Sequence, residues 1–134
     1  MYLSFISIAH AKTSEMQCLT DMAYMEAKSG GKVGIKDVVD VMFNRVDSKH
    51  FPDGICSNLY KRGQYPWASK ITPNRKTAHY KEVSKIVDEI YAKRKLGSWK
   101  DGTNGSLFFN NHGKKPTKKV KLVMARKGHY FFKM

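Results

Sequence analysis

The chain has 134 residues, a length that fits one domain, and 41% of them are hydrophobic, which excludes a disordered protein. Its 25 lysines and arginines outnumber its 11 aspartates and glutamates, so the formal net charge is +14. This charge favours an anionic partner, such as nucleic acid, an acidic membrane surface or a bacterial cell wall. The last 33 residues contain eight basic residues and no acid. A solvated basic face explains that run as well as polyanion binding does.

Residues 1–13 form an N-terminal segment, which we separate from a single domain spanning residues 14–134. The stretch from Tyr2 to Ala9 is apolar, and Ala9-His10-Ala11 follows the pattern of a signal-peptidase site, but no positive charge precedes it. The segment is therefore either a weak export signal or the first element of the fold. No later stretch reaches the roughly 18 consecutive apolar residues that a transmembrane helix needs.

Hydrophobic periodicity predicts three main helices followed by short strands. We expect helices over residues 14–28, 34–46 and about 76–96, and one helical turn over residues 55–60. The start of the last long helix is placed at Asn74 or Lys76, and Gly97 ends it. Residues 61–73 contain glycine and proline and are expected to form a loop. Strands are expected over residues 107–109, 119–124 and 129–132. The predicted fold class is therefore a mainly helical α+β domain.

Glu26 stands at an unusual position in the first predicted helix. Cys18, Leu19 and Met22 form an apolar stripe, and Glu26 continues it four residues after Met22. A carboxyl group that faces a core is costly to ionise, and a carboxyl that stays protonated near neutral pH can serve as a general acid. The alternative is that Glu26 lies in the last turn and reaches solvent past Gly30.

Several other catalytic designs are absent from the sequence. There is no GxxxxGK phosphate loop, no HExxH motif and no GxSxG elbow. The five histidines are scattered, so we expect each of them on the surface or in packing. No metal site and no cofactor is predicted, which leaves acid catalysis by Glu26. Cys18 and Cys56 are either two buried thiols or, outside the cytoplasm, a disulfide.

Six segments of the chain follow one another in the order of a known set of motifs. They read YMEAKSG (24–30), VMFNRV (41–46), FPDGICSNLY (51–60), QYPW (64–67), GSLFF (105–109) and KGHYFF (127–132). They resemble the motifs of the SleB/CwlJ-type cell wall hydrolases, a family that includes spore-cortex-lytic enzymes and phage and bacterial wall hydrolases. No single motif is specific, but six in order, at similar spacings, cover nearly the whole chain.

The resemblance implies a lysozyme-like fold, with Glu26 as the catalytic residue at the end of the first core helix. It implies cleavage of peptidoglycan glycan strands between N-acetylmuramic acid and N-acetylglucosamine, as a lytic transglycosylase or a muramidase. Glu26 would protonate the glycosidic oxygen and then remove the proton of the muramic 6-hydroxyl, which closes a 1,6-anhydro ring.

The resemblance also suggests residues that contact the substrate. Trp67 and Tyr65 are candidates for stacking on sugar rings, and Gln64 for a hydrogen bond to an acetamido group; ordinary loop packing is the alternative for all three. The other wall of the cleft would contain Phe109, Asn110 and His112. Cys18 and Cys56 stand where many family members carry cysteines, so a disulfide between them is implied.

The chain departs from the family pattern at two places. Pro66 replaces the small polar residue of the family's Q-x-S-W motif, which leaves the hydrogen bonding of that loop in doubt. Ser29-Gly30-Gly31 replaces the usual glycine and glutamate after the catalytic pair, so a second carboxylate near Glu26 is missing from that place.

The sequence is compatible with three functions. The first is a monomeric peptidoglycan-cleaving enzyme of the phage-lysis type, which acts at the wall, in the periplasm or on the extracellular face. Its basic C-terminal segment would hold it on the anionic envelope. The second is a nucleic-acid-binding module, against which the scarcity of aromatic residues between Lys114 and Lys127 argues; no nucleic acid is therefore expected. The third is an inactive wall-binding protein.

Overall fold

The computed structural model describes residues 12–27 and 29–134. Most of the predicted N-terminal segment 1–13, and with it the choice between export signal and first element, lies outside the described residues. The described elements follow the chain in this order: α1 (Ser14–Ala27), α2 (Gly31–Asp47), α3 (Ile55–Leu59), α4 (Ala78–Lys95), β1 (Phe108–Asn110), β2 (Lys121–Arg126) and β3 (His129–Lys133). The predicted mainly helical α+β class is confirmed.

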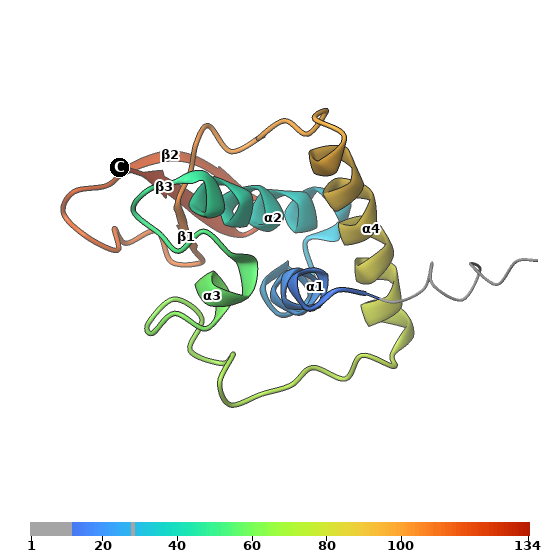
Figure 1. The fold of residues 1–134 in the computed structure, drawn as a ribbon. Helices are drawn as coiled ribbons and strands as arrows, with labels where there is room; N and C mark the ends of the chain where they lie inside the picture. Colours follow the sequence, from blue (N-terminus) through green and yellow to red (C-terminus); the bar gives the residue numbers. More distant parts are fainter. Residues whose placement is uncertain (1–11, 28) are drawn as a thin grey trace, which may run out of the picture.

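Helix α1 forms the centre of the molecule. Figure 1 looks along it and shows α2, α3 and α4 around it, and it packs against all three. The apolar stripes of the helices meet in one core, whose fully buried members include Leu19, Met22, Val38, Val39, Met42, Phe43, Val83 and Val87. Because three neighbours cover α1, its position is set by packing rather than by its own helix propensity.

Helix boundaries differ from the predicted ones where a local hydrogen bond decides them. Helix α2 begins at Gly31 rather than at residue 34, because the Gly34 amide already donates to the Gly30 carbonyl over 3.1 Å. Helix α4 begins at Ala78, after the predicted start at Asn74 or Lys76, because the Thr77 side chain accepts a hydrogen bond from the Tyr80 amide and caps the helix there.

The three strands form one antiparallel sheet in the order β1-β3-β2. Phe109 pairs with Phe131 across the first ladder, and Met124 pairs with Phe131 across the second, with an irregularity between Leu122 and Met124. Each strand lies within two residues of its predicted range. The central position of β3 explains why Phe131 and Phe132 are fully buried.

Two buried aspartates of α2 fasten the C-terminal half of the chain to the helices. Arg126 donates two hydrogen bonds to Asp37, at 2.9 Å and 2.6 Å, and so joins β2 to α2. Asp40 accepts from Trp99, from the Gly102 amide and from Lys36. Burial raises the pKa of Asp40, and these three donors oppose that effect.

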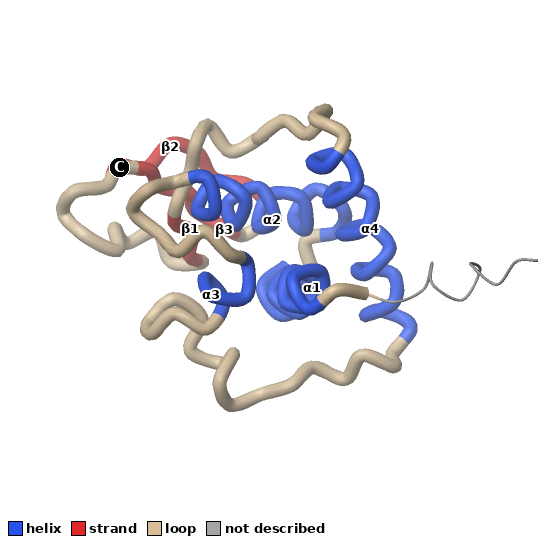
Figure 2. Tube along the Cα trace, viewed as in Figure 1, coloured by secondary structure: helices blue, strands red, loops and turns tan. Residues whose placement is uncertain are grey.

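The long connection between α3 and α4, residues 60–77, contains neither helix nor strand (Figure 2). It is nevertheless anchored to α1 near both ends. At the first end, Cys18 and Cys56 form a disulfide with Cα atoms 5.4 Å apart, and Glu15 accepts from the Ile55 and Cys56 amides.

At its other end the connection is held by a single residue of α1. Arg75 donates to both oxygens of Asp21, at 3.1 Å and 2.7 Å, and Tyr80 donates to the same carboxylate at 2.6 Å. Burial and the neighbouring Asp21 raise the pKa of the Tyr80 phenol, which therefore stays protonated as a donor.

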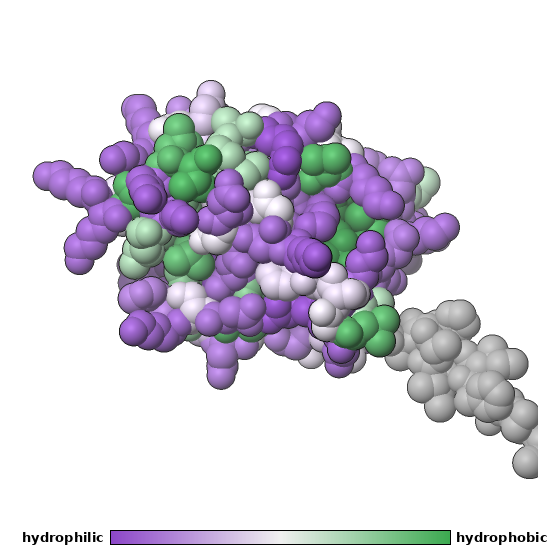
Figure 3. All heavy atoms as spheres, turned by 90° about the horizontal axis from the view of Figure 1, so that it is seen from above, coloured by the Kyte–Doolittle hydropathy of each residue, from purple (hydrophilic) through white to green (hydrophobic). Residues whose placement is uncertain are grey.

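The surface is largely polar. The face in Figure 3 is dominated by hydrophilic residues, with small separate hydrophobic areas. None of the described helices is long and apolar enough to cross a membrane.

We predict that removing the disulfide destabilises the domain. The bridge closes a loop with a sequence separation of 38 residues, and the loop-entropy model gives about 4 kcal/mol for a loop of that size. Urea unfolding of Cys18→Ser/Cys56→Ser should show a free energy of unfolding lower by about that amount. Reductant should shift the wild-type midpoint toward that of the variant and leave the variant's own midpoint in place. Equal midpoints for the two oxidised proteins would contradict the prediction.

Candidate active site

Glu26 lies in the last turn of α1, at the edge of the core. Leu19 and Met22 on the same stripe are fully buried, whereas Glu26 is half-buried because the helix ends one residue later, at Ala27. The carboxyl group is thus carried by a rigid buried helix while it stays accessible. This arrangement lies between the two sequence-based alternatives, which were a core-facing acid and a solvent-facing one.

The indole of Trp67 holds the Glu26 carboxyl group. Its Nε1–H donates to Oε2 of Glu26 over 2.6 Å. The two residues come from distant parts of the chain, since Trp67 lies in the connection between α3 and α4. A short N–H donor fixes the orientation of a carboxylate. Among the described residues, the structure gives Oε1 of Glu26 no hydrogen-bond partner, so this oxygen is available to a substrate.

Glu26 opens into a hollow of about 320 Å³. This Glu26 hollow is lined from α1, from β1 and the turn after it, and from the first residue of β3, by Met25, Glu26, Phe109, Asn110, Asn111, His112 and His129. The aromatic face and the amides suit a ligand that combines apolar rings with polar groups.

A second hollow of about 380 Å³ adjoins the first. We name it the basic arm; it shares Phe109, Asn110 and His112 with the Glu26 hollow and is lined further by Arg45, Gly63, Gln64, Phe108, Lys114, Lys115, Pro116 and Thr117. Each volume lies within the roughly 300–1,000 Å³ typical of ligand sites. We call the Glu26 hollow and the basic arm together the groove. An elongated ligand could therefore lie along it past Glu26.

The buried guanidinium of Arg45 fixes the inner side of the groove. It donates to the Leu107 carbonyl at 2.7 Å and to the Tyr65 hydroxyl at 3.1 Å. It also lies 5.1–5.7 Å from the ring centres of Phe51, Tyr65 and Phe108. One side chain of α2 thus joins the connection between α3 and α4, which lines the basic arm through Gly63 and Gln64, to the segment that enters β1.

The structure brings most of the predicted site residues together. Phe109, Asn110 and His112 line the Glu26 hollow, and Gln64 lines the basic arm. Trp67 reaches the carboxyl group itself.

Tyr65 is placed differently from the other predicted residues. It is 5% exposed, lines neither hollow and packs behind Phe109 with ring centres 6.5 Å apart. Burial raises the pKa of its phenol. Its position is that of a core residue held by Arg45, which donates to its hydroxyl, and the ring of Trp67 lies against it with centres 6.5 Å apart.

His129 also lines the Glu26 hollow, although it was not among the predicted site residues. Its ring packs against Phe109 and Phe131, with centres 5.1 Å and 6.0 Å away. Its Nδ1 atom is buried, and no described residue forms a hydrogen bond with it. Its place in the KGHYFF motif (127–132) was the available sequence signal. Asn111, Lys114 and Lys115 were also missed, because they belong to a turn whose course depends on the sheet.

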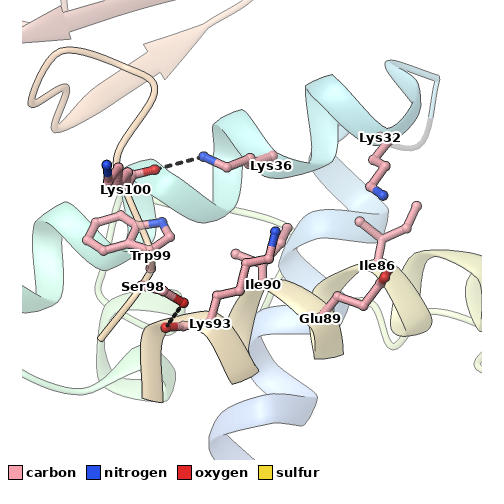
Figure 4. A pocket seen from close by; sticks show the side chains of 9 residues that line it. All are labelled: Lys32, Lys36, Ile86, Glu89, Ile90, Lys93, Ser98, Trp99 and Lys100. Carbon is pink, nitrogen blue, oxygen red and sulfur yellow. Dashed lines mark hydrogen bonds between the residues drawn. The ribbon is translucent and has the colours of Figure 1, made fainter. Parts of the chain in front are cut away.

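A further hollow, between α2, α4 and the segment after α4, has a different character (Figure 4). Ile86, Ile90 and Trp99 form its apolar part, and Glu89 is the one acid among its lining residues. Lys36, at its edge, donates to the Lys100 carbonyl and to Asp40. None of the predicted site residues lines it, so it is not the candidate active site. Among the described residues, no group of histidine, cysteine, aspartate and glutamate could hold a metal ion.

Comparison with known proteins assigns the chain to a family. The model of a family described as Cell Wall Hydrolase matches residues 29–132. The chain belongs to the cell wall hydrolase family. The resemblance found in the sequence, and the class of enzyme it implied, are thereby confirmed. The match begins three residues after Glu26, so the argument for this residue rests on its geometry.

Two solved structures share the fold of this cell wall hydrolase. One is the catalytic domain of the germination-specific lytic transglycosylase SleB from Bacillus anthracis, with a TM-score of 0.65 and 19% sequence identity over 92% of this chain and 98% of that one. The other is the catalytic domain of the Bacillus cereus SleB protein, with a TM-score of 0.64 and 19% identity over 92% and 94%. At this identity the likeness establishes the fold. The curated protein sequences contain no match.

We predict that Arg45→Lys lowers the free energy of unfolding by about 2 kcal/mol, because an ammonium group cannot replace the planar fork that reaches both walls. Urea unfolding measures the change. The matched control is Arg62→Lys at an exposed position of the adjoining loop, which should leave the midpoint in place. Equal midpoints for the two variants would show that Arg45 does not hold the walls.

Proposed function

We propose that this cell wall hydrolase cleaves the glycan strands of peptidoglycan between N-acetylmuramic acid and N-acetylglucosamine, with Glu26 as the single acid and base. The observation that carries the proposal is the position of Glu26, which is held by Trp67 at 2.6 Å and opens into a groove lined by an aromatic ring and amides. Aromatic faces and amide groups are suited to sugar rings and their acetamido substituents.

In the proposed reaction the Glu26 carboxyl group acts first as a general acid and then as a general base. Protonated Glu26 donates its proton to the glycosidic oxygen as the bond to C1 of N-acetylmuramic acid breaks. The resulting carboxylate then removes the proton of the muramic 6-hydroxyl, whose oxygen bonds to C1 and closes the 1,6-anhydro ring. The proton balance is restored at Glu26, and no water enters the products.

The composition of the groove favours this outcome over hydrolysis. Glycosidases that use water or a covalent intermediate need a second carboxylate about 5–9.5 Å from the acid. Among the described residues that line the groove, Glu26 is the only acid. An attack by the substrate's own hydroxyl requires no such partner, so we propose a lytic transglycosylase rather than a muramidase.

The surrounding side chains take the remaining roles in this proposal. Phe109 offers its face to a sugar ring, and the amide of Asn111 and the ring of His129 face the same hollow. Gln64 would contact an acetamido group farther along. The net charge of +14 would concentrate the enzyme at the anionic wall, and we expect a monomer that acts there.

We expect Glu26→Gln to lower the release of soluble muropeptides from purified sacculi by about 10³-fold, because general acid and base catalysis are lost together. Circular dichroism and thermal unfolding serve as the control that the variant is folded. Release at the wild-type rate by the folded variant would exclude Glu26 as the acid.

The products distinguish the two possible reactions. Mass spectrometry of the muropeptides released by the wild type should find 1,6-anhydromuramic ends. Reducing muramic ends, heavier by one water, would show hydrolysis and would overturn the transglycosylase assignment while leaving Glu26 as the acid.

We predict that Trp67→Phe lowers kcat about 10-fold or more, because an aromatic ring remains while the hydrogen bond that orients the Glu26 carboxyl group is lost. Trp99→Phe is the matched control, since it removes an indole N–H that donates to Asp40 at 2.7 Å outside the groove. The control should lose stability and keep its kcat. An equal kcat for the two variants would argue against a positioning role of Trp67.

A further inference from the structure

The basic arm of the groove carries a charge that neutral sugar rings and acetamido groups do not require. Its lining contains Arg45, Lys114 and Lys115 and no acid. It joins the Glu26 hollow at Phe109, Asn110 and His112. A substrate positioned for cleavage at Glu26 therefore extends toward three positive charges.

We propose that the basic arm binds the carboxylates of the peptide stem attached to N-acetylmuramic acid, so that the enzyme prefers peptide-bearing glycan strands to bare ones. This inference rests on the proposed function. In a peptide-bearing strand the sugar rings are neutral and the lactyl carboxyl group of each muramic acid is bound in the amide to its stem, so the anionic groups are the carboxylates of the stems. A strand without stems keeps one free lactyl carboxylate at each muramic ring and has no carboxylate farther out. A stem next to the cleaved bond is the part of the substrate that lysines at the end of this groove would meet.

The turn that presents the lysines is built by its own hydrogen bonds. Asn110 donates through Nδ2 to the Lys114 carbonyl at 2.8 Å and accepts from the Gly113 amide at 2.8 Å. The Lys114 amide donates to Nδ1 of His112 at 3.1 Å. Gly113 has a φ of +82°, a left-handed backbone conformation in which a residue with a side chain would be strained. The backbone of Lys114 is therefore fixed relative to β1 and the groove.

The charges of the arm are also available. Five basic residues elsewhere in the described chain are paired with aspartates: Lys12, Lys36, Arg75, Arg94 and Arg126. Within the described residues, no ion pair engages Lys114 or Lys115, and no acid occurs after Asp101 in the sequence. Arg45 adds a buried positive charge. Its two hydrogen bonds go to neutral oxygens, those of the Leu107 carbonyl and the Tyr65 hydroxyl. A carboxylate in this arm would meet uncompensated positive charge.

The test compares two substrates and two double variants. The substrates are glycan strands that keep their stems and the same strands after an amidase has removed them. The stripped strands retain one lactyl carboxylate at each muramic ring, so the comparison tests the carboxylates of the stem and not the presence of charge as such. The variants are Lys114→Gln/Lys115→Gln and, as the control, Lys118→Gln/Lys119→Gln, which removes the same charge from the same segment but outside the lining of the groove.

We expect the wild type to show a kcat/KM about 10-fold higher for peptide-bearing strands, as two moderately exposed charge contacts would give. The ratio of the two kcat/KM values should fall to near one in Lys114→Gln/Lys115→Gln and keep its wild-type value in the control. A ratio near one in the wild type, an unchanged ratio in the first variant, or an equal fall in both variants would overturn the proposal. An equal fall would point to general attraction by surface charge, as for any polyanion.

A binding measurement separates this inference from the proposed chemistry. Glu26→Gln should bind peptide-bearing strands more tightly than stripped ones in calorimetry, and the added Lys114→Gln/Lys115→Gln substitutions should abolish that difference. If the wild type cleaves neither substrate while this binding preference holds, the proposed function fails and the basic arm stands. If cleavage occurs and the binding preference is absent, the proposed role of the basic arm is wrong and the proposed function stands.

Discussion

The site depends on the attachment of one irregular connection to one buried helix. Residues 60–77 have no sheet or helix of their own, yet they must bring Trp67 to within 2.6 Å of Glu26. Two of the contacts that hold it start from α1, where Cys18 bridges to Cys56 and Asp21 binds Arg75. A third comes from Arg45 of α2, which donates to the Tyr65 hydroxyl. Because Glu26, Cys18 and Asp21 share one helix, a displacement of that helix moves the Glu26 carboxyl group and the Trp67 segment together.

The fold could be predicted largely from local patterns. The apolar stripe through Leu19 and Met22 predicted α1. The observed ends of the helices differ from the predicted ones where a local hydrogen bond sets the boundary, as the Thr77 cap does for α4. The strands were found because aromatic and β-branched residues lie between turn residues. These features depend on neighbours in the chain, which is why the sequence alone was enough.

The site could be predicted only in part. Glu26 was identifiable because a carboxyl group on an apolar stripe conflicts with burial. Tyr65 and Trp67, however, are equivalent in the sequence, and only the buried Arg45, 20 residues away, decides that Tyr65 turns inward. His129 joins the groove because β3 pairs with β1, and the lysines of the basic arm follow a turn folded by Asn110. Such long-range choices leave no local signal.

The internal use of the aspartates has a consequence for how the molecule behaves in solution. Asp21, Asp37 and Asp40 are buried and hold the connection, the sheet and the segment after α4 against the helices. They neutralise arginines and lysines locally but present little negative charge outward. The exterior still carries exposed acids, among them Asp47, Asp53, Glu82 and Glu89, but the basic residues outnumber them and the net charge is +14. Attraction of the molecule to an anionic polymer therefore weakens as ionic strength rises, because salt screens exposed charges.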